Sequence, residues 1–312
     1  MSKGRNYSTI AAIDRLFLIA IYAAVGLFVL LVTLLFASLV KGSWPSLVKF
    51  GLAFLWTSQW NPVTETFGAL PLIFGTVVSS LIAIVLAGVV GILAAAYLAE
   101  FAPRWLARPL SFVIELLAAV PSVVFGLWGL FVLAPFVRTA LGPFLQHTLG
   151  FLPIFSGPIL NGTGMLTAGL ILALMILPTV TAISREVIVA IAQDLREASM
   201  SLGATRWETV ARIVLPAARV GIFGAIVLAL GRAIGETIAT TMVIGNRPEI
   251  AVSLFAPSYT LASVIANEFT EANGNLYIGA LLELGLLLFI VSFIINGAAR
   301  LLLFAVLKGE RT

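Results

Sequence analysis

Residues 185–219 read "REVIVAIAQDLREASMSLGATRWETVARIVLPAAR" and lie between two strongly apolar segments. They contain two short helical patterns. The first runs to Leu202 and stops at Gly203, a residue typical of helix C-termini. The second opens at Thr205 and has Glu208 three residues later, which is the spacing of a capping box. This pattern predicts a helical corner, whereas an ordinary helix–helix connection needs only about two to eight residues.

The second pattern also predicts an apolar helix face. Its apolar residues follow a helical spacing and are Trp207, Val210, Ile213 and Val214. Pro216 predicts a bend into the next segment. A protruding helical corner costs ordering entropy unless a partner receives it. We therefore interpret residues 185–219 as a docking loop. The alternative is an amphipathic helix that lies on the membrane surface.

The composition on either side of this loop is that of a membrane protein. Of 312 residues, 61% are hydrophobic and 10% are charged, against about 25% charged residues in soluble domains. The chain has no cysteine, which excludes disulfides, cysteine-bound zinc and thiol chemistry. We interpret the lone histidine, His147, as a solvated loop residue, and we expect no metal site and no cofactor.

Six segments are long and apolar enough to cross a bilayer, which takes about 20 residues. We expect an all-α polytopic membrane protein with spans at Leu16–Val40, Leu70–Ala99, Phe112–Phe136, Met165–Ile183, Val220–Gly245 and Tyr277–Leu307. The first span is too long for a signal peptide and is expected to be retained. The chain then divides into residues 1–69, the first helix with the first outer segment, and residues 70–307, the transmembrane core with loop 185–219.

The distribution of Lys and Arg fixes the expected orientation. With the N-terminus inside, 13 basic residues are cytoplasmic: Lys3, Arg5, Arg15, Arg104, Arg108, Arg185, Arg196, Arg206, Arg212, Arg219, Arg300, Lys308 and Arg311. Four are outside: Lys41, Lys49, Arg138 and Arg247. The positive-inside rule therefore predicts that both termini are cytoplasmic. The net charge of +4 is a topology signal, and we expect no nucleic-acid partner. Trp44, Trp56 and Trp60 are predicted to be interfacial anchors.

Two ionised groups lie inside the fifth predicted span, in "LALGRAIGETIATTMVIG", residues 228–245. In a continuous helix Arg232 and Glu236 share one face. A charge at the bilayer centre costs about 2.5–3.5 kcal/mol on insertion scales, so such residues pair or face an aqueous cavity. One interpretation is a structural ion pair. The other is that Arg232 binds a passing anion through its planar guanidinium, while Glu236 holds Arg232 between cycles. Gly231 and Gly235 have the GxxxG spacing that allows another helix close.

The docking loop also carries a recognisable motif. Its residues match E-A-A-x3-G-x9-I-x-L-P at Glu197, Ala198, Gly203, Ile213, Leu215 and Pro216, with Ser199 in place of the second alanine. This resembles the loop shared by permease subunits of type I ABC importers. The resemblance implies that the loop docks into a separate ATP-binding subunit. The chain itself has no G-x-x-x-x-G-K-[ST] loop to hold ATP phosphates, so we expect a transport subunit without enzymatic activity.

Further segments resemble the permeases of phosphate importers of the PstC type. They are "WNPVTETFGALPLIFGT" (60–76), "AVPSVVFGLWGLFVLAPF" (119–136), "GRAIGET" (231–237), "MVIGN" (242–246) and "NLYIGALLELGLLLFIVSFIIN" (275–296). The resemblance implies a type I importer fold in the bacterial cytoplasmic membrane, and phosphate passage at Arg232 and Glu236. It also implies membrane lipid around the chain and several partner proteins: a PstA-type sister permease, two PstB-type ATP-binding subunits and a PstS-type phosphate-binding protein.

Other functions stay open at this point. A permease of the same fold for another oxyanion, such as sulfate, molybdate or phosphonate, differs only in the span motifs. A self-contained secondary transporter predicts two six-helix halves or an internal repeat, and a membrane enzyme predicts a nucleophile with a base or a metal cluster. The sequence shows neither pattern. The leading prediction is a permease that moves inorganic phosphate by alternating access, driven by ATP hydrolysis in another subunit.

Overall fold

The computed structural model describes the backbone of residues 7–308, and within them the regular secondary structure is helical apart from two isolated β-bridges. In chain order the α-helices are α1 Tyr7–Phe50, α2 Ala53–Trp56, α3 Leu70–Ala96, α4 Arg104–Ala118, α5 Ser122–Trp128, α6 Ala134–Phe136, α7 Gly142–Leu149, α8 Met165–Val189, α9 Gln193–Ser201, α10 Arg206–Thr209, α11 Leu215–Ile234, α12 Ile238–Val243, α13 Leu261–Glu268 and α14 Asn275–Lys308. Short π-helical turns follow α3 (Tyr97–Phe101) and α10 (Val210–Val214), and others interrupt the helices after α5 and α6.

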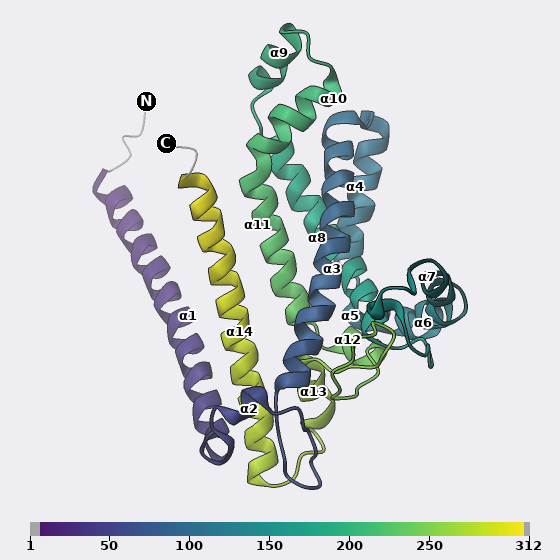
Figure 1. Ribbon diagram of the computed structural model, residues 1–312. Helices are drawn as coiled ribbons and strands as arrows, with labels where there is room; N and C mark the ends of the chain where they lie inside the picture. Colours follow the sequence, from purple (N-terminus) through teal and green to yellow (C-terminus); the bar gives the residue numbers. More distant parts are fainter. Residues whose placement is uncertain (1–6, 309–312) are drawn as a thin grey trace.

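Six helical segments among the described residues are long and apolar enough to cross a membrane, as predicted. The start of α1 and the end of α14 lie at the same end of the molecule as α9 and α10 (Figure 1), which fits the predicted cytoplasmic placement of loop and termini. The basic residues Lys3, Arg5 and Arg311 lie outside the described part of the chain.

The helix α8 forms the centre of the bundle. Two thirds (67%) of its most apolar window is buried, whereas none of the window in α1 is. Small residues line the contact of α8 with α3 and α11, including Ala83, Ala87, Ala173 and Ala229, and small side chains let helix backbones approach closely in a membrane. The helix α1 packs along α14 at one side of this bundle (Figure 1).

Two of the predicted spans are not continuous helices. The third, predicted over Phe112–Phe136, breaks after Ala118, because Pro121 lacks an N–H and disfavours helical backbone at the residue before it. The fifth, predicted over Val220–Gly245, ends at Ile234, and the chain re-enters a helix only at Ile238. The two outer pieces, α5 and α12, pack against each other.

A cluster of aromatic side chains closes the outer end of the fold. The Trp60 indole Nε1 and the Tyr277 hydroxyl both donate to Glu268 Oε2, at 2.8 and 2.7 Å. The Phe67 ring stacks on Tyr277 with centroids 5.3 Å apart. Trp60 is therefore buried, and its prediction as an interfacial anchor was wrong, whereas Trp44 and Trp56 are exposed.

Candidate coupling loop and translocation site

The glycine corner forms as the sequence predicts. Gly203 has a φ of +88°, in the left-handed region. Its amide donates to the Met200 carbonyl at 3.0 Å, and the Ala204 amide donates to the Ser199 carbonyl at 3.3 Å. These two bonds form a Schellman motif, which satisfies carbonyls that a helix end otherwise leaves without partners. The corner is therefore a defined local structure.

The second arm of the corner begins with the predicted capping box. The Glu208 amide donates to Thr205 Oγ1 at 3.3 Å, and the Thr205 amide donates to Glu208 Oε2 at 3.0 Å. The Oγ atoms of Ser199 and Thr209 lie 3.0 Å apart and join α9 to α10. This contact gives a physical role to Ser199, the one departure from the alanine of the motif.

The apolar face predicted for the second arm is divided. Val210 and Val214 are buried, whereas Trp207 is exposed, because the π-helical turn Val210–Val214 changes the register of the helix. Pro216 does not end the helix and lies in the first turn of α11. Ile213 and Leu215 are half-buried.

Four apolar side chains at the cytoplasmic end of the molecule face solvent, and we call them the docking face: Leu195, Met200, Leu202 and Trp207. Leu202 is 90% exposed, and Glu197 and Ala198 of the motif are exposed beside it. A concentration of apolar surface that extends away from the bundle marks a site for protein contact. Sequence reasoning found the motif residues but not Leu195 and Met200.

Arg232 and Glu236 are not one ion pair on one helix, which corrects the prediction. Arg232 lies in the last turn of α11, Gly235 ends that helix, and Glu236 follows it. The Glu236 carboxylate instead accepts a hydrogen bond from the Ala239 amide at 3.2 Å, so it caps the start of α12. A carboxylate at a helix N-terminus is stabilised by free amides and by the helix dipole.

The Arg232 side chain is exposed on the surface of this subunit and has no hydrogen bond or ion pair to the described residues. Leu228, one turn earlier, is 61% exposed on the same side of α11. The end of α11 lies between the levels of the two ends of α14 (Figure 1). The unpaired guanidinium of Arg232 therefore lies at a helix break, between the levels of the two ends of the apolar helix α14.

Another side of α11 faces the last helix. A Cβ at Gly231 would stand 3.7 Å from the side-chain amide atoms of Asn296 in α14, an ordinary van der Waals contact. The GxxxG spacing thus brings α14 near the same turn through Gly231.

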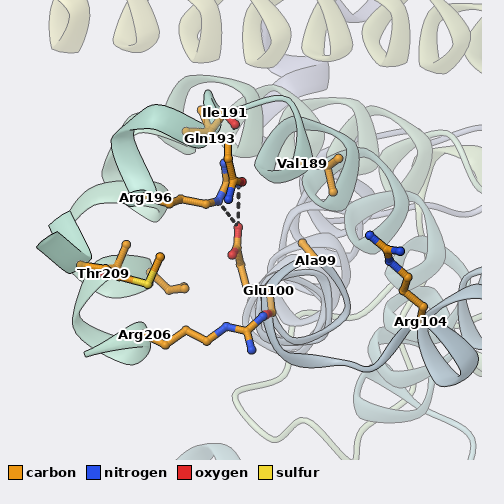
Figure 2. A pocket seen from close by; sticks show the side chains of 11 residues that line it. Ala99, Glu100, Arg104, Val189, Ile191, Gln193, Arg196, Arg206 and Thr209 are labelled. Atoms are coloured by element: carbon orange, nitrogen blue, oxygen red, sulfur yellow. Dashed lines mark hydrogen bonds and ion pairs between the residues drawn. The ribbon is translucent and has the colours of Figure 1, made fainter. Parts of the chain in front are cut away.

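A cluster of charges that the sequence did not reveal lies at the inner end of α3. Arg196 forms an ion pair with Glu100, and both residues line a cleft of about 770 Å³ with Arg104 and Arg206 (Figure 2). Glu100 directly follows the predicted end of the second span. It lies 96 residues from Arg196, and no local spacing connects the two.

Comparison with known proteins places the chain in a family. Residues 87–308 match the family described as "Binding-protein-dependent transport system inner membrane component". The chain is 46% identical to the phosphate transport system permease protein PstC of Mesorhizobium japonicum, over 97% of this chain and 93% of that protein. It is 43% identical to PstC of Haemophilus influenzae, over 97% of each chain. A probable PstC of Methanocaldococcus jannaschii is 34% identical, over 89% of this chain and 88% of that protein.

The fold is similar to that of a solved ABC importer. A chain of the MetNI methionine ABC transporter, in an inward-facing conformation, matches with a TM-score of 0.57 and 17% identity, over 80% of this chain and 99% of that chain. A second crystal form matches with a TM-score of 0.54 over 75% of this chain and 93% of that chain. The predicted type I importer permease fold and the multi-pass location in the cytoplasmic membrane are confirmed. This chain belongs to the PstC family of phosphate transport system permease proteins, within the binding-protein-dependent transport system inner membrane components.

Proposed function

We propose that this chain is the permease subunit of an ATP-driven importer that moves inorganic phosphate across the cytoplasmic membrane by alternating access. The observation that carries the proposal is the similarity to proteins named PstC, which extends over nearly the whole chain. The names of these relatives favour phosphate over sulfate, molybdate or phosphonate.

ATP hydrolysis takes place in a separate subunit in this proposal, and the docking face is where that subunit binds. Three structural facts support the assignment. The corner is fixed by its Schellman motif and capping box, the docking face exposes four large apolar side chains, and Glu197 is exposed beside them. An apolar centre with a charged rim is the usual composition of a protein interface. Two PstB-type subunits would bind the permease pair.

In the proposed complex a PstA-type sister permease covers the side of α11 on which Arg232 is exposed. An exposed Arg232 in contact with lipid would carry the insertion cost of about 2.5–3.5 kcal/mol. A sister subunit and an aqueous path between the two permeases remove that cost. A PstS-type protein delivers phosphate from outside. Residues 70–307 form the core of the permease. Residues 1–69 add the helix α1, which packs on α14 of the core.

Arg232 contacts phosphate in this path through its planar set of donors, which suits phosphate oxygens. Glu236 has a different role from the one predicted from sequence. It caps α12 and so holds the helix break that leaves Arg232 at a free helix end.

Transport by the purified complex tests the proposal. The assembled transporter is reconstituted into proteoliposomes, with ATP at the face of the docking loop and the binding protein at the other. We expect ATP-dependent accumulation of radiolabelled phosphate that a tenfold excess of sulfate or molybdate leaves largely unchanged. Accumulation of sulfate or molybdate without phosphate would assign the chain to another oxyanion.

A further inference from the structure

The ion pair between Glu100 and Arg196 joins the coupling corner to the second span. Arg196 Nη2 and Nε donate to Glu100 Oε1 at 2.7 and 3.0 Å. Only 11% and 9% of the two side chains are exposed. Figure 2 shows the two side chains reaching toward each other from α9 and from the end of α3. A buried, doubly hydrogen-bonded pair of this kind holds a single geometry.

The same guanidinium also binds the inner end of α8. Arg196 Nη2 donates to the Ile188 carbonyl at 2.8 Å, and Nη1 donates to the carbonyls of Ala192, at 3.3 Å, and Ile191. The Ile188 carbonyl lies in the last turn of α8, where a helix leaves acceptors without partners and favours a cation, and the other two carbonyls lie in the turn between α8 and α9. One side chain thus fastens three elements: α9, α8 and the end of α3.

The other arm of the corner contacts the same place. Arg206 donates to the backbone carbonyl of Glu100, and its guanidinium lies 5.5 Å from the centroid of the Phe101 ring. The Trp207 ring is 6.2 Å from Phe101. The first arm of the corner therefore contacts Glu100, and the second arm contacts both Glu100 and Phe101.

This junction combines polar contacts with apolar packing, since the inner end of α3 also packs on α8 and on the start of α11 in a buried cluster that includes Ala95, Ile188 and Val214. The cleft of about 770 Å³ lies beside the ion pair, and its lining includes Ala99, Gln193, Met200 and Thr209. The corner is continuous in sequence with α8 and α11, so motion of the corner reaches those spans through the backbone. The helix α3 is not continuous in sequence with the corner, and Glu100 and Phe101 make its side-chain contacts with α9 and α10.

We propose that Glu100 is a positioning residue for transport: its pair with Arg196 ties the second span to the coupling corner, so that both move as one body when nucleotide is hydrolysed. This rests on the proposed docking of the corner to an ATP-binding subunit. The pair is set back from the docking face, so it transmits the motion without forming the interface.

The test is the number of phosphate ions moved per ATP hydrolysed by the reconstituted complex. Glu100→Gln removes the charge and leaves Arg196 bound to the α8 carbonyls, so the corner keeps its fold. We expect co-purification of the ATP-binding subunit and ATP hydrolysis to be retained, while the transport ratio falls about fivefold. Glu186→Gln is the matched control, because Glu186 is an exposed carboxylate at the inner end of α8, and its ratio should equal that of the unmodified protein.

A second variant restores the connection by another bond. The chain has no cysteine, so Glu100→Cys with Gln193→Cys places two thiols on the end of α3 and on α9. We expect a low transport ratio that rises again when a short bifunctional thiol reagent joins the two positions.

Three results would overturn the proposal: an unchanged ratio in Glu100→Gln, loss of the ATP-binding subunit from that variant, or a cross-link that stops transport. The second would mean that the pair builds the docking face, and the third that the pair must open. Failure of the docking proposal itself is visible elsewhere, as an intact complex in a variant whose glycine corner is disrupted.

Discussion

Gly75 of α3 lies directly against the backbone of Tyr259: a Cβ at Gly75 would stand 2.2 Å from the Tyr259 carbonyl oxygen. That contact joins the second span to the segment that precedes α13. We expect Gly75→Ala to force the two backbones apart and to destabilise the protein by about 1–3 kcal/mol, the usual cost of overpacking. The check is the melting temperature of the solubilised protein.

The same helix supplies a control for this substitution. Gly88 lies three to four turns further along α3, and a Cβ there would meet nothing within 4 Å. Gly88→Ala should leave the melting temperature unchanged or raise it, since alanine favours helix by about 1 kcal/mol. Equal melting temperatures for Gly75→Ala and the unmodified protein would contradict the close contact.

Gly203 tests the docking of the corner. No atom lies within 4 Å of a Cβ at this position, so the cost of Gly203→Val comes from the left-handed backbone alone. The ATP-binding subunit should co-purify poorly with Gly203→Val, while insertion of the chain stays normal. Gly203→Asn is the control, because asparagine tolerates this conformation better and should retain the partner. An intact complex and normal uptake in Gly203→Val would refute docking at the corner.

Glu268 holds together the aromatic cluster at the outer end of the fold, which we call the outer cap. Its Oε2 accepts hydrogen bonds from both Trp60 and Tyr277. Glu268→Ala leaves the buried Trp60 indole and the half-buried Tyr277 hydroxyl without their acceptor, and an unsatisfied buried donor costs about 1–3 kcal/mol. We expect faster amide hydrogen exchange over residues 51–69 in this variant. Glu249→Ala, an exposed carboxylate outside the cap, should leave the exchange unchanged, and equal exchange in both variants would show that the cap does not depend on Glu268.

The orientation of the chain can be tested with single cysteines. Val63, which is 92% exposed, lies in the first outer segment, and Leu202 lies on the docking face. An impermeant thiol reagent should label Val63→Cys in intact cells, and it should label Leu202→Cys only in permeabilised cells that lack the ATP-binding subunit. Labelling of Leu202→Cys from outside intact cells would show that the chain has the opposite orientation in the membrane.

Local chemistry explains which parts of the fold were predictable. The corner at Gly203 and the cap at Thr205 depend on neighbouring residues, and few other residue types can take the place of glycine at the one or threonine at the other. The end of α11 was missed because the apolar pattern continues past Gly235, and a glycine within a helix costs only about 1 kcal/mol. The hydrogen bond by which Glu236 caps α12 depends on that end, so the apolar pattern could not predict it.

Contacts between distant residues were not predictable from one sequence. Glu100 and Arg196 are 96 residues apart, and Trp60 and Glu268 are 208 residues apart. Composition placed Arg196 in the cytoplasm but assigned it no partner. The motif identified Glu197 and Gly203, which face the solvent, whereas the adjacent Arg196 faces inward and connects the corner to α3.

In the proposed function, Arg232 binds phosphate as it crosses the membrane. The most direct test is ATP-driven phosphate uptake by proteoliposomes that carry Arg232→Gln, with ATP hydrolysis measured in the same preparation. Loss of charge-assisted hydrogen bonds to the anion should lower uptake by about 10- to 100-fold, while the complex assembles and hydrolyses ATP. Arg232→Lys keeps the charge but not the planar donors, so its phosphate uptake should lie between that of Arg232→Gln and that of the unmodified protein. Substantial phosphate uptake by the double variant Arg232→Gln with Glu236→Gln would contradict the claim and leave Arg232 as part of the scaffold.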